Sequence, residues 1–145
     1  MSDGYVTRNF KREAFACMCG CGKKFYVSAE LAKILQALRE RVKEPLTVTS
    51  GMRCKKHNTE INGAKESYHL LRGGILLGSD ITYSREESRT PLKMMRLRIL
   101  ADEFIIKHGG GAKGGLGLYP TWLHIDTRKD KDGARWIDRR WRFPK

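Results

Sequence analysis

The sequence predicts an α+β fold, because short strand patterns are interspersed with two sizeable helical patterns. The chain has 145 residues, 40% of them hydrophobic, including three Trp, five Tyr and five Phe. That length and composition can bury one core, so we expect residues 1–145 to form a single domain. No apolar run approaches the roughly 18 residues that span a bilayer, and we therefore expect no membrane insertion.

The first helical pattern begins at Ser28, which can cap a helix that runs to about Lys43. Glu30 in its first turn favours the positive end of the helix dipole, and apolar residues follow at helical spacing. An irregular arm, residues 1–27, precedes the helix and contains cysteines. The other patterns of this half predict strands at 24–27 and 45–50, a short helix at 55–61 and a loop at 62–65.

The second helical pattern begins at Thr90, an N-cap followed by proline at the first helical position, where no needed hydrogen bond is lost. It should stop at the glycines 109–111. The remaining patterns predict strands at 76–83, 116–119 and 122–127, then a basic, aromatic end at 128–145. We expect this end to form one or two final strands whose aromatic side chains are core and whose arginines are solvated.

The net charge is strongly positive, because 29 Lys and Arg oppose 16 Asp and Glu and leave +13. Such a charge favours anionic partners: nucleic acid, acidic lipid headgroups or an anionic cell-wall polymer. Trp136, Trp141 and Phe143 are interleaved with the basic residues of the tail, which would also suit a nucleic-acid stacking surface. Charge alone does not choose among these partners.

The four cysteines form two groups, with Cys17, Cys19 and Cys21 in the arm and Cys54 three residues before His57. Alternate residues of a strand share a face, so the thiolates can converge on one ion. The Cys-x-x-His spacing is a common zinc half-site. A structural zinc held by arm cysteines, Cys54 and His57 is one interpretation; disulfides and buried free thiols are the alternatives.

Two histidines and an aspartate could form a second metal site. Strand alternation puts Trp122, His124 and Asp126 on one face, which is accessible if the opposite apolar face is core. His69 ends a polar loop, and Asp80 lies at the start of a strand. Two imidazoles and a carboxylate leave one zinc position open for water, as hydrolytic zinc sites require.

The order of motifs along the chain is distinctive. The motifs are Thr49-Ser50-Gly51-Met52-Arg53, His57-Asn58, Ser67-x-His69, Gly-x-Asp80-Ile81 and Trp122-Leu123-His124-Ile125-Asp126. This order resembles the zinc D-Ala-D-Ala carboxypeptidases, in particular the compact branch of phage endolysins and bacterial wall hydrolases, from about Asn9 to Asp126. The resemblance implies a Hedgehog/D,D-peptidase fold, in which an antiparallel sheet carries the metal and helices pack on its other side.

The resemblance also implies roles for individual residues. It implies that the zinc ligands are His69, Asp80 and His124. Arg53 would lie near the metal and steady developing oxyanion charge. Ser67 would orient the first ligand loop, or would only bond its own backbone. Asp126 would act as the base, or would hold the imidazole of the last ligand by a hydrogen bond.

Two features depart from the family pattern. His69 and Asp80 are eleven positions apart, as if four residues were inserted around 72–75. An even insertion preserves the face that Asp80 occupies, and its apolar residues could form a lip over the substrate groove. Several relatives carry an acid three residues before the last ligand, where this chain has Thr121.

The leading hypothesis is a zinc peptidase that cuts peptidoglycan stem peptides or cross-links at a D-Ala-containing bond. The alternative is a non-catalytic zinc-containing module of the same fold that binds wall polymer or a protein. A nucleic-acid protein ranks below both. The N-terminus lacks the apolar stretch of a secretory signal. We therefore expect a protein made in the cytoplasm that acts on the wall after release, as a phage lysin does. We also expect a monomer.

Overall fold

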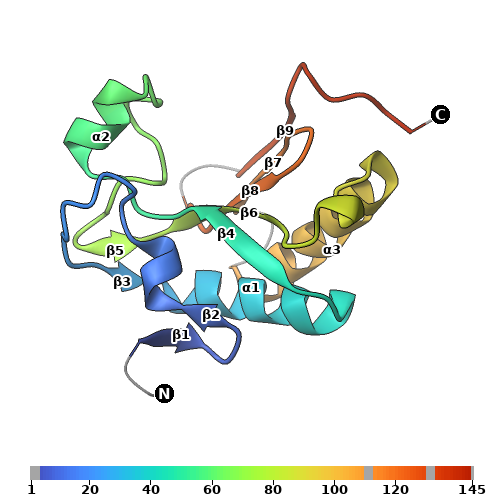
Figure 1. Ribbon diagram of the computed structural model, residues 1–145, viewed down its shortest axis with the longest axis horizontal. Coiled ribbons are helices and arrows are strands. Elements are labelled where there is room, and N and C mark those ends of the chain that lie inside the picture. The colour runs from blue at the N-terminus through green and yellow to red at the C-terminus, as the bar shows by residue number, and fades with distance from the viewer. Residues whose placement is uncertain (1–3, 110–112, 130–132, 145) are drawn as a thin grey trace.

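A five-stranded sheet with the strand order β4-β6-β8-β7-β9 forms the centre of the fold (Figure 1). The computed structural model describes residues 4–109, 113–129 and 133–144. The strands of the sheet are β4 (Leu46–Ser50), β6 (Gly78–Tyr83), β7 (Gly115–Leu118), β8 (Leu123–Asp126) and β9 (Ala134–Ile137). The architecture is therefore mixed α+β, as the sequence predicts.

The sheet is not wholly antiparallel, which corrects one expectation. The pairs β4–β6, β6–β8 and β7–β8 are antiparallel, whereas β7 and β9 are parallel. Strand β7 lies between β8 and β9, and it pairs with both. Because β7 and β9 are both antiparallel in direction to β8, they run parallel to each other.

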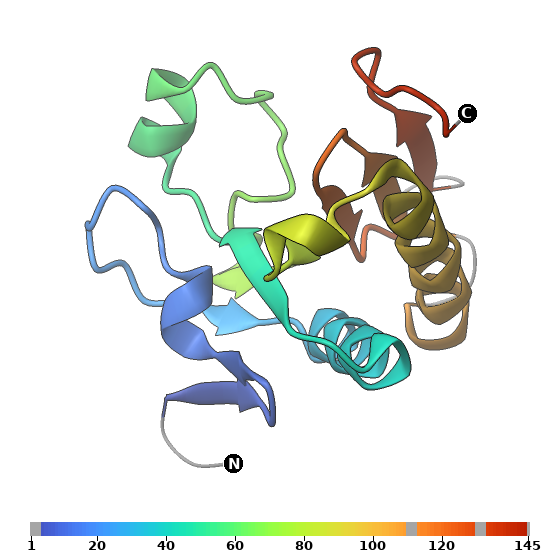
Figure 2. The ribbon, with the colours of Figure 1, turned by 45° about the vertical axis from the view of Figure 1, so that its right-hand side comes forward.

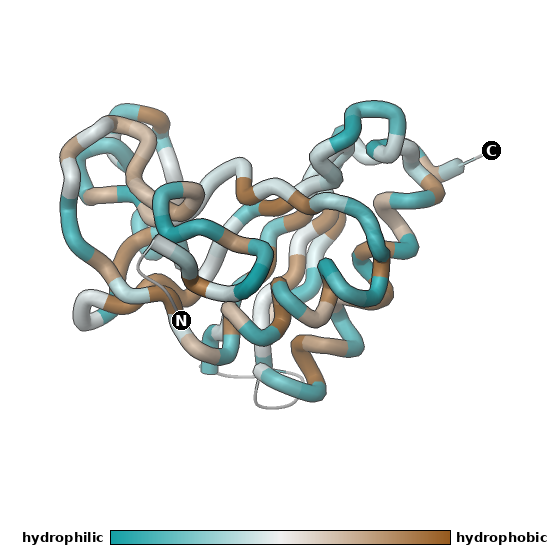
Figure 3. Tube along the Cα trace, turned by 60° about the horizontal axis from the view of Figure 1, so that its bottom comes forward, coloured by the Kyte–Doolittle hydropathy of each residue, from teal (hydrophilic) through white to brown (hydrophobic). Residues whose placement is uncertain are grey.

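Two long helices pack together and against the sheet. The Ser28 hydroxyl caps α1 (Ala29–Val42) by accepting a hydrogen bond from the backbone N–H of the third helical residue. The Thr90 hydroxyl caps α3 (Pro91–His108) in the same way. Both helices begin at the predicted caps, and Figure 2 shows them lying together, away from the short helix α2 (Lys55–Glu60). Their apolar faces and the strands form most of the core. Figure 3 shows apolar, brown positions interspersed with polar, teal ones along the trace.

The N-terminal arm is packed onto the domain. Its hairpin pairs β1 (Tyr5–Thr7) with β2 (Phe10–Lys11), and the following turn buries Phe15 completely. The residues between this turn and β3 (Tyr26–Val27) form a loop, so the strand predicted from residue 24 is shorter than expected. A parallel bridge to β5 (Ile75–Leu76) ties the end of the arm to the middle of the chain.

The residues that lengthen the spacing before Asp80 form a tight hairpin tip. Arg72 bridges Ile75, and the intervening Gly73 and Gly74 have φ angles of +59° and +80°, which glycine adopts without steric cost. Leu76 is fully buried, and β5 pairs with the arm. The expected lip over a substrate groove is therefore wrong, because this insertion extends the core and the small sheet instead.

The aromatic end of the chain divides among three environments. Trp141 is buried, Trp136 is half-buried in β9, and Phe143 is 63% exposed. The prediction that all three are core is therefore correct only for Trp141. Of the basic residues of this end, Lys131 and Lys145 lie outside the described residues. Among the helices described, none is both long and apolar enough to cross a membrane.

Candidate metal centre

His69, Asp80 and His124 meet at one point of the structure. Asp80 in β6 lies directly opposite His124 in β8, and His69 arrives from the loop between α2 and β5. The Asp80 Oδ1 atom lies 3.1 Å from His69 Nε2 and 3.0 Å from His124 Nδ1. One ligand atom from each residue lies within 4.8 Å of the other two. Two imidazoles and a carboxylate at this separation fit a divalent metal such as zinc.

The backbone fixes the orientation of the His69 ring. Its Nδ1 atom lies 2.7 Å from the Gly51 carbonyl oxygen, which can only accept, so Nδ1 carries the proton and donates. The Nε2 lone pair therefore faces Asp80. The Ser67 hydroxyl accepts a hydrogen bond from the His69 backbone N–H at 3.1 Å, so this serine bonds nearby backbone, as one of its two expected roles requires.

A carboxylate behind the His124 ring holds it from the other side. Asp126 Oδ2 lies 2.8 Å from His124 Nε2, and the Arg128 guanidinium donates to both Asp126 oxygens at 2.6 and 2.8 Å. Asp126 is 0% exposed and His124 is 7% exposed. The expectation that both stand on an accessible face is therefore wrong for Asp126, which Arg128 covers, whereas His124 lines a pocket.

The titration of these groups follows from their contacts. Burial raises the pKa of Asp80, but the contacts that this carboxylate makes with the His124 and His69 rings outweigh burial and hold that pKa well below its usual range. Burial lowers the pKa of His124, whereas its bonds to Asp126 and Asp80 raise it, and the net shift is upward. A metal at this centre must therefore displace a proton from His124, so its affinity should fall as pH falls.

The centre opens into a basic pocket of about 670 Å³. Three arginines line it, Arg53, Arg128 and Arg140, together with the aromatic residues Tyr68, Tyr119, Trp122 and Trp136. The Arg53 guanidinium donates to Asn58 Oδ1 at 3.2 Å, and its backbone N–H donates to the His69 carbonyl at 2.8 Å. The sequence-predicted Arg53 thus lies beside the first predicted ligand. Among the described lining residues, the carboxylates are Glu66 and Asp80.

Comparison with known families agrees with this arrangement. A family model described as Peptidase M15 matches residues 8–126, which include all three residues of the centre. The chain belongs to the M15 peptidase family. No curated protein and no solved structure matches it significantly. The predicted resemblance is thereby confirmed, and with it a metallopeptidase with zinc as the cofactor of the family.

The C-terminal end of this M15 peptidase forms one wall of the pocket, whereas the sequence predicts that its aromatic side chains belong to the core. The Trp136 ring lies 5.4 Å from that of His124, and its indole N–H donates to the Tyr119 hydroxyl at 3.1 Å. Arg128 lies over the Trp136 ring and that of Tyr68. The interleaved basic and aromatic residues were the available signal, but the register that brings β9 beside β7 could not be read from them.

Two glycines of β7, which belong to none of the sequence motifs, leave the space that this wall occupies. Gly115 lies opposite Asp126 and Gly117 lies opposite His124 on the neighbouring strand. A Cβ atom at Gly115 would overlap the Asp126 carboxylate, and one at Gly117 would overlap the Trp136 indole. Alternate glycines inside a strand are the signal for such close approach.

We expect Gly117→Ala to lower peptide hydrolysis by about 10- to 100-fold, because the new methyl group displaces Trp136 from the His124 ring and disturbs the ligand geometry. Steady-state kinetics and tryptophan fluorescence measure the two effects. Adding Trp136→Leu, which removes the ring atoms that the new methyl group would overlap, should recover part of the loss. A Gly117→Ala enzyme with unchanged kinetics would show that this contact does not matter.

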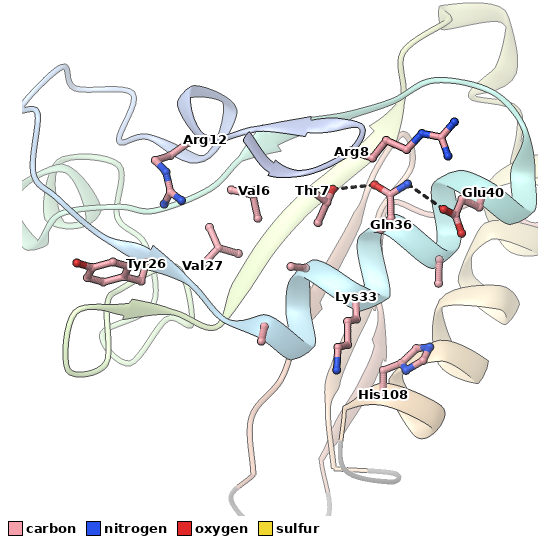
Figure 4. Close-up of a pocket in the computed structure, with 13 residues that line it drawn as sticks. Val6, Thr7, Arg8, Arg12, Tyr26, Val27, Lys33, Gln36, Glu40 and His108 are labelled. Atoms are coloured by element: carbon pink, nitrogen blue, oxygen red, sulfur yellow. Dashed lines mark hydrogen bonds between the residues drawn. The ribbon is translucent and has the colours of Figure 1, made fainter. Parts of the chain in front are cut away.

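A second cavity of about 680 Å³ lies between the arm and α1 (Figure 4). Val6, Tyr26 and Val27 give it an apolar side, and Gln36 bonds the Thr7 hydroxyl across it. No group of three or more potential metal ligands lies there among the described residues. We therefore do not assign it to the chemistry of this M15 peptidase.

The cysteines form the other convergent group. Cys17, Cys19, Cys21 and Cys54 each contribute a sulfur to a cluster within 4.8 Å. The arm cysteines lie in a loop rather than the expected strand, so turns and not strand alternation bring them together. The His57 imidazole is not part of the cluster; instead the His57 backbone N–H donates to Cys54 Sγ at 3.4 Å.

Proposed function

We propose that this M15 peptidase hydrolyses peptide bonds in peptidoglycan stem peptides or cross-links, at a D-Ala-containing bond. The observation that carries the proposal is the meeting of three metal-binding side chains, proposed as the ligands His69, Asp80 and His124, at a pocket that opens to solvent. Zinc bound by two imidazoles and a carboxylate activates water for attack and polarises the scissile carbonyl.

The chain's own residues would prepare this centre. The Gly51 carbonyl and Asp126 each accept a hydrogen bond from the N–H on the far side of a histidine ring, so that both rings offer a lone pair to the metal. Because Asp126 is fully buried and occupied by His124 and Arg128, we assign it to positioning instead of proton transfer. Glu66 is then the described carboxylate of the pocket lining that can accept a proton from water.

The charge of the pocket suits an anionic substrate. Arg53 is proposed to stabilise the negative charge that develops on the scissile carbonyl oxygen, as a fixed cation does in a site shielded from water. Stem peptides of the cell wall carry free carboxylates, and the net charge of +13 raises their concentration near the protein. The aromatic residues of the pocket supply apolar contact area beside these cations.

The biological setting is part of the proposal. An enzyme of this specificity would act on the wall from inside after membrane breakdown, in the manner of a phage lysin, and as a monomer. The alternative, a non-catalytic binding module, is favoured by one observation: the position three residues before His124 holds Thr121, where several relatives carry an acid.

Peptide release from purified sacculi separates these two functions. We expect soluble peptides and free D-Ala to accumulate with the zinc-loaded enzyme, and release to stop after zinc is removed by a chelator and resume when zinc is returned. Mass spectrometry of the released fragments identifies the bond that is cut. Co-sedimentation with the sacculi without any released peptide would favour the binding module, and release that persists without metal would contradict the proposal.

A further inference from the structure

The four cysteine sulfurs are spaced as the ligands of one metal ion. Cys17 Sγ lies 3.2 Å from Cys19 Sγ and 3.8 Å from Cys54 Sγ, and Cys19 Sγ lies 3.6 Å from Cys54 Sγ. Tetrahedral zinc with Zn–S bonds of about 2.3 Å separates its sulfurs by about 3.8 Å. A disulfide would join two sulfurs at about 2.05 Å and would leave the others unexplained. The spacing therefore fits a shared ion better than a covalent pair.

The backbone around the sulfurs has the features of a thiolate cradle. The Cys54 N–H donates to Cys17 Sγ at 3.4 Å, and the His57 N–H donates to Cys54 Sγ at the same distance. Gly20 and Gly22, which flank Cys21, have φ angles of +77° and +68° and let the loop turn back on itself. Such N–H donors stabilise sulfur in its ionised, metal-binding form.

The charges nearby are those that a zinc tetrathiolate needs. Four thiolates and one divalent cation leave a charge of −2. The residues that follow each cysteine segment are exposed lysines, Lys23 and Lys24 in the arm and Lys55 and Lys56 at the start of α2. Their positive field offsets the excess negative charge of the cluster.

We propose that Cys17, Cys19, Cys21 and Cys54 form a closed structural zinc site that fastens the N-terminal arm to the segment 51–54. The two parts are far apart in sequence and lie side by side in Figures 1 and 2, where the arm loop passes beside α2. All four positions of the ion are filled by protein, so the site holds structure and leaves no place for substrate.

The position of this site links it to the proposed catalytic centre. The Met52 N–H donates to the Phe15 carbonyl at 2.7 Å, which ties the arm to the segment 51–54 just before the first cysteine. The same segment contains the Gly51 carbonyl that orients His69 and the Arg53 that lines the pocket. A zinc ion on Cys54 would therefore hold both groups in place. Only this last step rests on the proposed function.

Metal analysis of the purified full-length chain tests the site. We expect about two zinc ions per chain in the wild type and about one in Cys19→Ser/Cys21→Ser. Asp80→Asn should also hold about one, which separates a failure of this proposal from a failure of the proposed function. His57→Ala is the matched control and should retain both ions, because its imidazole is outside the cluster.

Two readouts do not depend on any cysteine variant folding. Replacing zinc with cobalt should produce sulfur-to-cobalt charge-transfer absorption in the wild type and in Asp80→Asn. The four thiols should be inert to a thiol reagent until a chelator is added, and hydrogen exchange at 51–54 should then rise by about 10-fold or more. Four freely reactive thiols in the zinc-loaded wild type, or cobalt loading without charge-transfer bands, would overturn the site.

Discussion

Replacing Asp80 with asparagine is expected to reduce peptide release by about 10³-fold or more, because it removes the charged ligand of the proposed metal centre. The Asp80 carboxylate oxygen lies about equally far from the His69 and His124 nitrogens, at 3.1 and 3.0 Å, and places a negative charge between them. An amide keeps the shape but is a weak zinc ligand. Release of D-Ala from wall peptides and the zinc content measure the effect.

The comparison variants separate loss of metal from loss of fold. Glu103→Gln changes an exposed carboxylate of α3 and should leave release unchanged. His69→Ala should match Asp80→Asn, whereas His108→Ala, at the end of α3, should behave as the wild type. Circular dichroism and thermal unfolding should show a folded domain in each case. Substantial release by Asp80→Asn at normal zinc content would remove this residue from the ligand set.

The elements of the fold could be predicted where local chemistry determines them. Ser28 and Thr90 cap the two long helices as their hydroxyl groups allow, and Pro91 occupies the first position of α3. The spacing between His69 and Asp80 could also be interpreted, because two adjacent glycines permit a hairpin tip and an even insertion preserves the face of a strand. In each case the determining residues are close in sequence.

The features that the sequence analysis missed depend on contacts between distant segments. The burial of Asp126 follows from Arg128 and from the return of the tail over the sheet, and strand alternation alone put it on an accessible face. The role of Trp136 follows from the parallel pairing of β7 and β9. The cysteines converge through a loop whose path depends on Gly20 and Gly22. Alternation and helical periodicity carry no information about these approaches.

Asp126→Asn is expected to lower zinc affinity by about 10- to 100-fold and to destabilise the fold by about 1–3 kcal/mol. Hydrogen bonds from Arg128 and His124 outweigh the effect of burial and hold the pKa of Asp126 well below its usual range, so the carboxylate is charged at neutral pH. An asparagine whose oxygen stays on Arg128 must turn its NH₂ group toward His124 Nε2. The ring then becomes an acceptor at Nε2 and carries its proton on Nδ1, the atom that faces Asp80.

The matched control is a second aspartate with the same local contacts. Asp138 accepts hydrogen bonds from the backbone N–H and from Nε of Arg140, as Asp126 does from Arg128. Within the part of the chain that the structure describes, no histidine bonds Asp138. Asp138→Asn should therefore leave zinc affinity unchanged. Competition with a chromophoric chelator measures affinity, and nitrogen NMR of the His124 ring reports which atom carries the proton. Because a lost ion pair alone would lower stability without moving this proton, the tautomer is the deciding observation. An Asp126→Asn protein that keeps wild-type zinc affinity and a proton on Nε2 would show that the carboxylate serves packing and not the metal centre.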